Sequence, residues 1–141
     1  MREILFKAKR IDNGKWVEGY YQKRYDLLGN EEHLIFHADS YTVWEYAEVD
    51  EETLCQFTGL CDKNGKKIWE NDIVLVTENV YSTVKFGLYH EALKSERTHQ
   101  GFYLESMDNY YYREELGYWA KESVVIGNIF DNPELLQEES E

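Results

Sequence analysis

The stretch QFTGLCDKNGKKIWENDIV, residues 56–74, carries the densest series of turn signals in the chain. Asn64 and Gly65 form the Asn-Gly pair that tight hairpin turns favour, because both residues tolerate positive φ. A continuous apolar run at 73–76 follows the next break and predicts a strand covered on both faces. The stretch therefore predicts short antiparallel strands joined by tight turns.

Further short strands are predicted on both sides of this stretch. Their ranges are 4–8, 15–21, 33–36, 40–47, 80–86, 101–106 and 123–130. Residues 48–53 are expected to be an exposed connector. Within 87–100, which has no clear pattern, the segment EALKSERT (91–98) favours a turn or two of helix or a long loop, and 107–117 is predicted as a helix or a wide aromatic connection. Aromatic residues make up 16% of the chain, which favours pleated, half-buried surfaces. We therefore expect a mainly β fold.

The C-terminal segment DNPELLQEE predicts a short helix. Asn132 is suited to the N-cap and Pro133 to the first helical position. So short a helix is marginal alone, so that Leu135 and Leu136 must dock on the rest of the fold or on a neighbouring subunit.

Composition excludes several classes of function. The net charge is −13, which disfavours direct binding to a nucleic-acid backbone. The N-terminus lacks the apolar core of a signal peptide, and no apolar run is long enough to span a bilayer. We therefore expect a cytoplasmic protein with no membrane partner. No nucleophile motif and no phosphate-binding glycine loop occurs, so neither an enzyme nor a cofactor is predicted.

His33 and His37 are the histidines with the closest spacing. On a helix this spacing would present both rings to one metal ion. The residues between them are apolar and favour a strand, on which the two rings would be about 13 Å apart. No metal site is predicted.

Three acidic residues surround the turns of the opening stretch, namely Asp62, Glu70 and Asp72. They could form the carboxylate cluster of a hydrolase. The favoured interpretation is structural: Asp62 caps the Asn-Gly turn, and Asp72 accepts hydrogen bonds from backbone N–H groups where the strand begins.

An aromatic run consisting of Tyr110, Tyr111 and Tyr112, followed by Trp119, is the candidate interface. Such rings can stack on bases, but the neighbouring charges are mostly acidic. A core or a subunit interface is the favoured use, together with Leu135 and Leu136.

Two separate blocks of sequence resemble one protein family. The blocks TLCQFTGLCDKNGKKIWENDIV and VVIGNIFDNPELL, with VKF between them, are similar to the YopX family of phage and prophage proteins. The N-terminal segments REILFKAKR and WVEGYY also resemble it. The resemblance implies an uncharacterised function, an SH3-like β-barrel and self-association, and it supplies no catalytic residues. Asn71 stands where the family pattern has glycine, which predicts positive φ at this position.

These observations predict one domain over 1–141. It consists of N-terminal strands at 1–50, an SH3-like, partly open barrel at 53–130 and an acidic helix or tail at 131–141. Asn64, Gly65, Asn71 and Asp72 are assigned to structural turns. The predicted function is that of a phage- or prophage-encoded accessory protein in the bacterial cytoplasm, which acts without catalysis through contacts with host or phage proteins and forms a homo-oligomer. The alternatives are an acidic decoy of a host nucleic-acid-binding protein and a hydrolase using carboxylates of the 62–72 turn.

Overall fold

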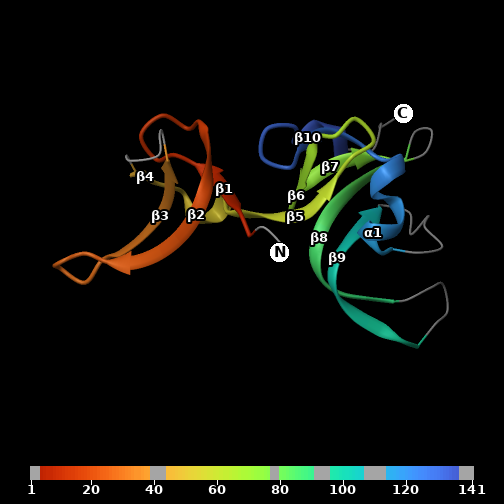
Figure 1. Cartoon of the computed structure of the whole chain (residues 1–141), viewed down its shortest axis with the longest axis horizontal. Coiled ribbons are helices and arrows are strands. Elements are labelled where there is room, and N and C mark those ends of the chain that lie inside the picture. Colours follow the sequence, from red (N-terminus) through yellow and green to blue (C-terminus); the bar gives the residue numbers. More distant parts are fainter. Residues whose placement is uncertain (1–3, 39–43, 77–79, 91–95, 107–113, 137–141) are drawn as a thin grey trace. The chain divides into compact units, whose positions relative to one another are not determined.

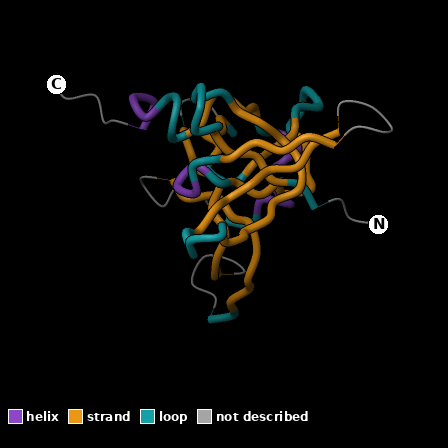
Figure 2. The backbone as a smooth tube through the Cα atoms, turned by 90° about the vertical axis from the view of Figure 1, so that its left-hand side faces the viewer, coloured by secondary structure: helices purple, strands orange, loops and turns teal. Residues whose placement is uncertain are grey.

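Strands make up most of the backbone in this computed structural model, which describes residues 4–38, 44–76, 80–90, 96–106 and 114–136 (Figures 1 and 2). The strands are β1 (Phe6–Lys9), β2 (Trp16–Tyr25), β3 (Glu31–Ala38), β4 (Trp44–Glu48), β5 (Cys55–Cys61), β6 (Lys67–Trp69), β7 (Asp72–Leu75), β8 (Tyr81–His90), β9 (Thr98–Ser106) and β10 (Val124–Asn128). The helical elements are α1 (Leu116–Trp119) and the 3₁₀ turns η1 (Glu51–Thr53), η2 (Ala120–Glu122) and η3 (Pro133–Leu136).

The chain divides into two compact units, Met1–Phe57 and Thr58–Glu141. The boundary lies inside β5, whose first residues pair with β1 and which also neighbours β6. The second unit therefore begins a few residues after position 53, where the barrel was predicted to start. The expectation of a single domain stays a prediction.

The first unit is an antiparallel sheet in the order β4-β3-β2-β1. Gly14 has φ of 70°, the conformation expected of the Asn13-Gly14 turn between β1 and β2. One face of the sheet covers a small core made by Ala8, Ile35, Ala47 and Val49. Because side chains alternate along a strand, the neighbouring positions of β2, β3 and β4 lie on the opposite face.

The second unit contains a sheet in the order β10-β7-β8-β9. Its core contains residues from strands, α1 and η2: Ile68, Val74, Val84, Leu104, Leu116, Ala120 and Val125. The predicted burial of the strand at 73–76 agrees with Ile73 and Val74, which are fully buried. Apolar residues from segments far apart in the sequence thus meet in one core.

The expected mainly β fold is confirmed. In the described part of the chain both sheets are open, because they end at edge strands and do not close on themselves. The SH3-like description stays a prediction. Within the same residues, every helix is too short or too polar to cross a bilayer.

The strands expected at 80–86 and 101–106 are longer than predicted, while residues 91–95 between them lie outside the described residues. β8 continues to His90 and β9 starts at Thr98, so the two strands form a long antiparallel hairpin. Cross-strand ring pairs support it, with ring centroids 5.8 Å apart for Tyr89 and His99. These pairs were not predicted because the sequence here lacks a strong alternation of apolar and polar residues.

The short C-terminal helix begins where it was predicted, as η3 with Pro133 as its first residue, and residues 137–141 lie outside the described residues. The side chain of Asn132 accepts a hydrogen bond from the backbone N–H of Asn128, and its backbone carbonyl accepts one from the Leu135 N–H. The connector at 48–53 is not wholly exposed. Val49 and Thr53 are buried, because η1 folds this segment back onto β1.

Candidate functional site

Gly65 and Asn71 have the positive φ that was predicted, whereas Asn64 does not, because Asp62 and Lys66 close a three-residue loop in which only Gly65 needs it. Gly65 has φ of 81°, and Asn71 has φ of 71°, the only positive value among the non-glycine residues that the structure describes. The Asn71 backbone N–H donates to the Val84 carbonyl, and its carbonyl accepts from Ile129. Asp72 accepts a 2.8 Å hydrogen bond from the Trp69 backbone N–H. These residues therefore hold strands together.

The Asp62 carboxylate likewise accepts hydrogen bonds from backbone N–H groups. One carboxylate oxygen accepts hydrogen bonds of 2.9 Å from the N–H groups of Asn64 and Lys66, and the other accepts from Val125 at 2.9 Å. Burial raises the pKa of Asp62, but the backbone hydrogen bonds outweigh burial and keep the pKa below its ordinary value. The structural interpretation of Asp62 is thus supported by geometry and charge.

The candidate interface residues are not brought together as one described surface. Tyr110, Tyr111 and Tyr112 lie outside the described residues. Trp119 packs against the core of the second unit, and its ring contacts Tyr118 at a centroid distance of 4.8 Å. Leu135 and Leu136 are half-buried in η3. Their assignment to an interface stays a prediction.

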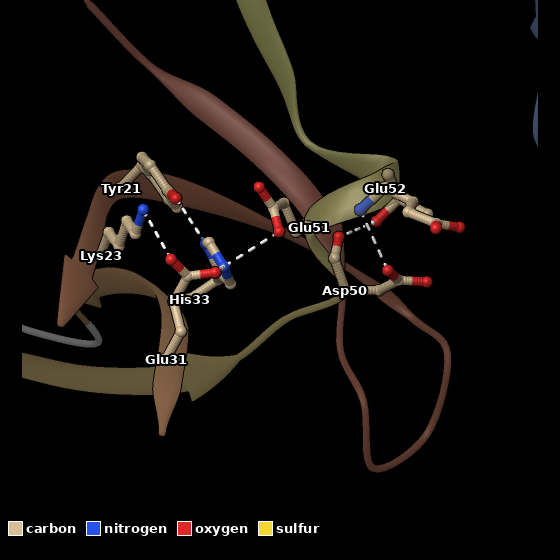
Figure 3. A network of polar contacts seen from close by, with 8 residues as sticks. Tyr21, Lys23, Glu31, His33, Asp50, Glu51 and Glu52 are labelled. Carbon is tan, nitrogen blue, oxygen red and sulfur yellow. Dashed lines mark hydrogen bonds and ion pairs between the residues drawn. The ribbon is translucent and has the colours of Figure 1, made fainter. Parts of the chain in front are cut away.

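A polar cluster that sequence analysis missed lies in the first unit, around His33 (Figure 3). The ring is buried, with 8% of the residue exposed. Its Nε2 atom lies 3.1 Å from Glu31 Oε2 and 3.1 Å from Glu51 Oε2. Its Nδ1 atom lies 2.5 Å from the Tyr21 hydroxyl. We call Glu31, His33 and Glu51 the carboxylate–histidine cluster.

The β2–β3 hairpin positions half of this cluster. Glu31 and His33 are two residues apart on β3, so their side chains lie on the same face. Lys23 lies directly opposite His33 on β2, and its Nζ atom contacts Glu31 Oε1 at 2.6 Å. Tyr21 comes from the same face of β2 and stacks on the His33 ring with an interplanar angle of 5°.

η1 positions the other half. Asp50 caps this turn by accepting a hydrogen bond from the Glu52 backbone N–H at 3.0 Å. The backbone N–H of Asp50 donates to the Lys9 carbonyl, and the hydroxyl of Thr53 accepts from the Lys9 N–H. Glu51 is thereby held in the first turn of η1, where its carboxylate faces His33.

The charges around the cluster shift the pKa of its neighbours. A hydrogen bond from Lys23, reinforced by one from His33, lowers the pKa of Glu31 below its usual range. Burial raises the pKa of the Tyr21 hydroxyl, and the nearby Glu51 carboxylate raises it further. At neutral pH Glu31 is therefore ionised, and the Tyr21 hydroxyl beside the cluster is protonated.

The cluster borders a pocket of about 430 Å³ in the first unit. The pocket is lined by Lys9, Arg10, Ile11, Gly14, Glu31, His33, Glu48, Val49, Asp50 and Glu51. Both carboxylates of the cluster remain accessible, since 39% of the Glu31 side chain and 62% of the Glu51 side chain are exposed. A ligand small enough for this pocket can reach the two acidic groups and the buried ring.

The opposite face of the same sheet carries exposed rings. Tyr20, Phe36 and Tyr46 lie opposite one another on three neighbouring strands, and Trp44 stands beside them on β4. Tyr20, Trp44 and Tyr46 are 52%, 58% and 55% exposed. The rings of Tyr20 and Trp44 are 6.0 Å apart, and those of Phe36 and Tyr46 are 5.7 Å apart. We call these four residues the aromatic face.

Comparisons with known proteins concern the whole chain. The sequence model of the family described as "YopX protein" matches residues 5–137. A solved structure, described as the crystal structure of protein EF1440 from Enterococcus faecalis, is similar with a TM-score of 0.53. It is 22% identical in sequence, and the match covers 97% of this chain and all of that one, which shows a shared fold. The comparison with curated proteins found no match.

Proposed function

Because the chain belongs to the YopX family, we propose that it is a phage- or prophage-encoded accessory protein of the bacterial cytoplasm that acts through protein–protein contacts and self-associates. The observation that carries the proposal is the aromatic face of the first unit. A non-catalytic role is supported by Asp62 and Asp72. The hydrolase alternative would use these carboxylates, but both accept hydrogen bonds from backbone N–H groups. The decoy alternative rests on net charge alone.

The aromatic face has the composition of an interface. Aromatic residues and arginine are enriched at the centres of protein–protein contacts, where rings bury much area with little loss of side-chain entropy. Three of the four rings are more than half exposed. The Arg24 guanidinium lies 5.1 Å from the ring centroid of Tyr46, so it is part of the same surface. Contact with a partner would remove these rings from water.

The position of β4 favours a second copy of the chain as the partner. β4 is the edge strand of its sheet, and it carries both Trp44 and Tyr46. Edge strands offer backbone N–H and carbonyl groups that can pair with another strand. Antiparallel pairing of β4 with β4 of a second copy would be two-fold symmetric and would join two aromatic faces into one.

Sedimentation velocity over a range of concentrations tests this proposal. We expect the wild type to exceed the 16.9 kDa mass of one chain and the double variant Tyr20→Ser/Trp44→Ser to shift to the monomer. Tyr25→Ser is the matched control, because Tyr25 is 63% exposed but belongs to the opposite face of β2. A monomeric wild type, or an unchanged oligomer in the double variant, would contradict the proposal.

A further inference from the structure

We propose that the carboxylate–histidine cluster Glu31, His33 and Glu51 binds a divalent first-row transition metal ion, for which Zn²⁺ is the probe. The three residues each offer one ligand atom, and these atoms all lie within 4.8 Å of one another. The inference concerns the core-side face of the first sheet and does not depend on the aromatic face or on self-association.

The first argument is the convergence of negative groups on one ring nitrogen. Glu31 Oε2 and Glu51 Oε2 both lie 3.1 Å from His33 Nε2, which offers a single hydrogen at most. Two carboxylates thus face a group that can satisfy only one of them well. A divalent cation placed among the three atoms is bound by all of them and balances both charges.

The second argument is size. Zn²⁺ binds imidazole nitrogen and carboxylate oxygen at about 2.0–2.2 Å, so that two of its ligand atoms are at most about 4.4 Å apart. Both nitrogen–oxygen separations fall inside this limit. The carboxylates of Glu31 and Glu51 are on exposed side chains, so they can close on an ion without any change in the buried ring.

The third argument is the support around the ligands. The ring nitrogen of a metal-binding histidine that does not bind the metal generally has a hydrogen-bond partner, which orients the ring. Tyr21 provides that partner on Nδ1 of His33. The Lys23 ammonium holds the second oxygen of Glu31 at 2.6 Å, leaving Oε2 directed at the ring. Figure 3 shows these side chains directed at one another from β2, β3 and η1.

The ligand set determines the class of ion. One imidazole with two carboxylates suits zinc and neighbouring transition metals, whereas Mg²⁺ prefers oxygen ligands and retains its waters. Three protein ligands leave the fourth tetrahedral position open. The pocket of about 430 Å³ adjoins all three ligands, so a water molecule or a small anionic group could occupy that position.

Isothermal titration of the chelator-treated full chain with ZnCl₂ tests the proposal. We expect saturable binding of one ion per chain, and the visible absorption of a four-coordinate site when Co²⁺ replaces Zn²⁺. Glu51→Gln should weaken Zn²⁺ binding by about tenfold or more, since it removes a ligand. Tyr21→Phe should weaken it by about tenfold through loss of ring orientation.

Glu52→Gln is the matched control. Glu52 is the next residue in η1, is exposed, and its loss changes the net charge by the same amount without removing a ligand of the cluster. Its affinity for Zn²⁺ should equal that of the wild type.

Three results would overturn the proposal. One is a wild type that neither binds Zn²⁺ with saturation nor develops the Co²⁺ absorption, in which case a proton alone joins the ring to the carboxylates. A second is an equal loss of affinity in Glu51→Gln and Glu52→Gln, which would indicate diffuse attraction to acidic side chains. The third is binding of Mg²⁺ as tight as that of Zn²⁺, which would exclude a role for the imidazole.

Discussion

Two pairs of acidic side chains, one pair in each unit of this protein, have different roles. In the second unit, Asp62 and Asp72 accept hydrogen bonds from backbone N–H groups within and between turns and strands. In the first unit, Glu31 and Glu51 face the side chain of His33 and border a pocket. The first arrangement leaves little of the carboxylate for anything but the fold, whereas the second keeps two exposed carboxylates available to a ligand.

The contrast separates residues that build the fold from residues that are available for function. A carboxylate bound to the main chain cannot be replaced without leaving buried N–H groups unsatisfied. A carboxylate on an exposed side chain can be replaced at small cost to folding. The variants below therefore test the comparison through the free energy of unfolding, measured by urea denaturation.

Trp69→Ala should have the largest effect. Trp69 is 5% exposed and its backbone N–H is bound by Asp72, so truncation should reduce the free energy of unfolding by about 3–5 kcal/mol. Tyr25→Ala, at a 63% exposed position of the first unit outside the aromatic face, is the control and should cost less than about 1 kcal/mol. A loss below about 1 kcal/mol for Trp69→Ala would indicate that Trp69 belongs to a binding surface and not to the core.

Asp62→Ala should come next, with a loss of about 2–3 kcal/mol, because three backbone N–H groups lose their acceptor. The effect depends on pH. Because the folded-state pKa of Asp62 is lowered, its stabilisation is present above the unfolded-state pKa near 3.9 and is lost as pH falls through the lower folded value. Urea curves from pH 7 to pH 2 should therefore show the wild type and Asp62→Ala converging in acid. If the difference in free energy of unfolding between the wild type and Asp62→Ala stays constant with pH, Asp62 is not the ionised group assigned here.

Substitutions of Asn71 should have a smaller and selective effect. Asn71→Val should lower the free energy of unfolding by about 1–2 kcal/mol, because a β-branched residue resists the φ of 71°. Asn71→Gly should be nearly neutral, since glycine adopts this conformation readily. If both variants unfold at the same urea concentration, the backbone conformation of this turn is not what limits the choice of residue.

Glu51→Gln should have the smallest effect. In the absence of metal we expect a change within about 0.5 kcal/mol, because the side chain is 62% exposed. A loss of unfolding free energy as large as that of Asp62→Ala would contradict this contrast, since it would show that the carboxylate–histidine cluster stabilises the fold of the first unit.

Local turn chemistry was predictable from the sequence. Gly65 and Asn71 have the positive φ expected of them, because an Asn-Gly pair and a glycine-like asparagine are constrained by their own backbones. The extension of β8 beyond 86 and of β9 before 101 was not predicted. Pairing there depends on cross-strand contacts such as Tyr89 with His99, whose ring centroids are 5.8 Å apart, and such contacts leave weak local patterns.

The carboxylate–histidine cluster was missed for a related reason. The spacing in the sequence relates His33 to His37, its near neighbour on the same strand, whereas the cluster combines His33 with Glu31 and Glu51. The alternation Glu31-x-His33 was a usable signal, since residues two apart on a strand share a face. The sequence contains no comparable signal that Glu51 lies near His33, because its position depends on the fold of η1 and on the Asp50 cap.

The hydrogen bond from Val125 to Asp62 has a consequence for the order of folding. It joins residues 63 positions apart, and the Lys63 backbone N–H likewise donates to the Ser123 carbonyl. The Asn-Gly turn is local in sequence, yet its capping carboxylate is fully satisfied only when β10 is in place. During synthesis on a ribosome, the turn therefore stays incomplete until β10 has emerged, and contacts so distant along the chain slow the search for the native state.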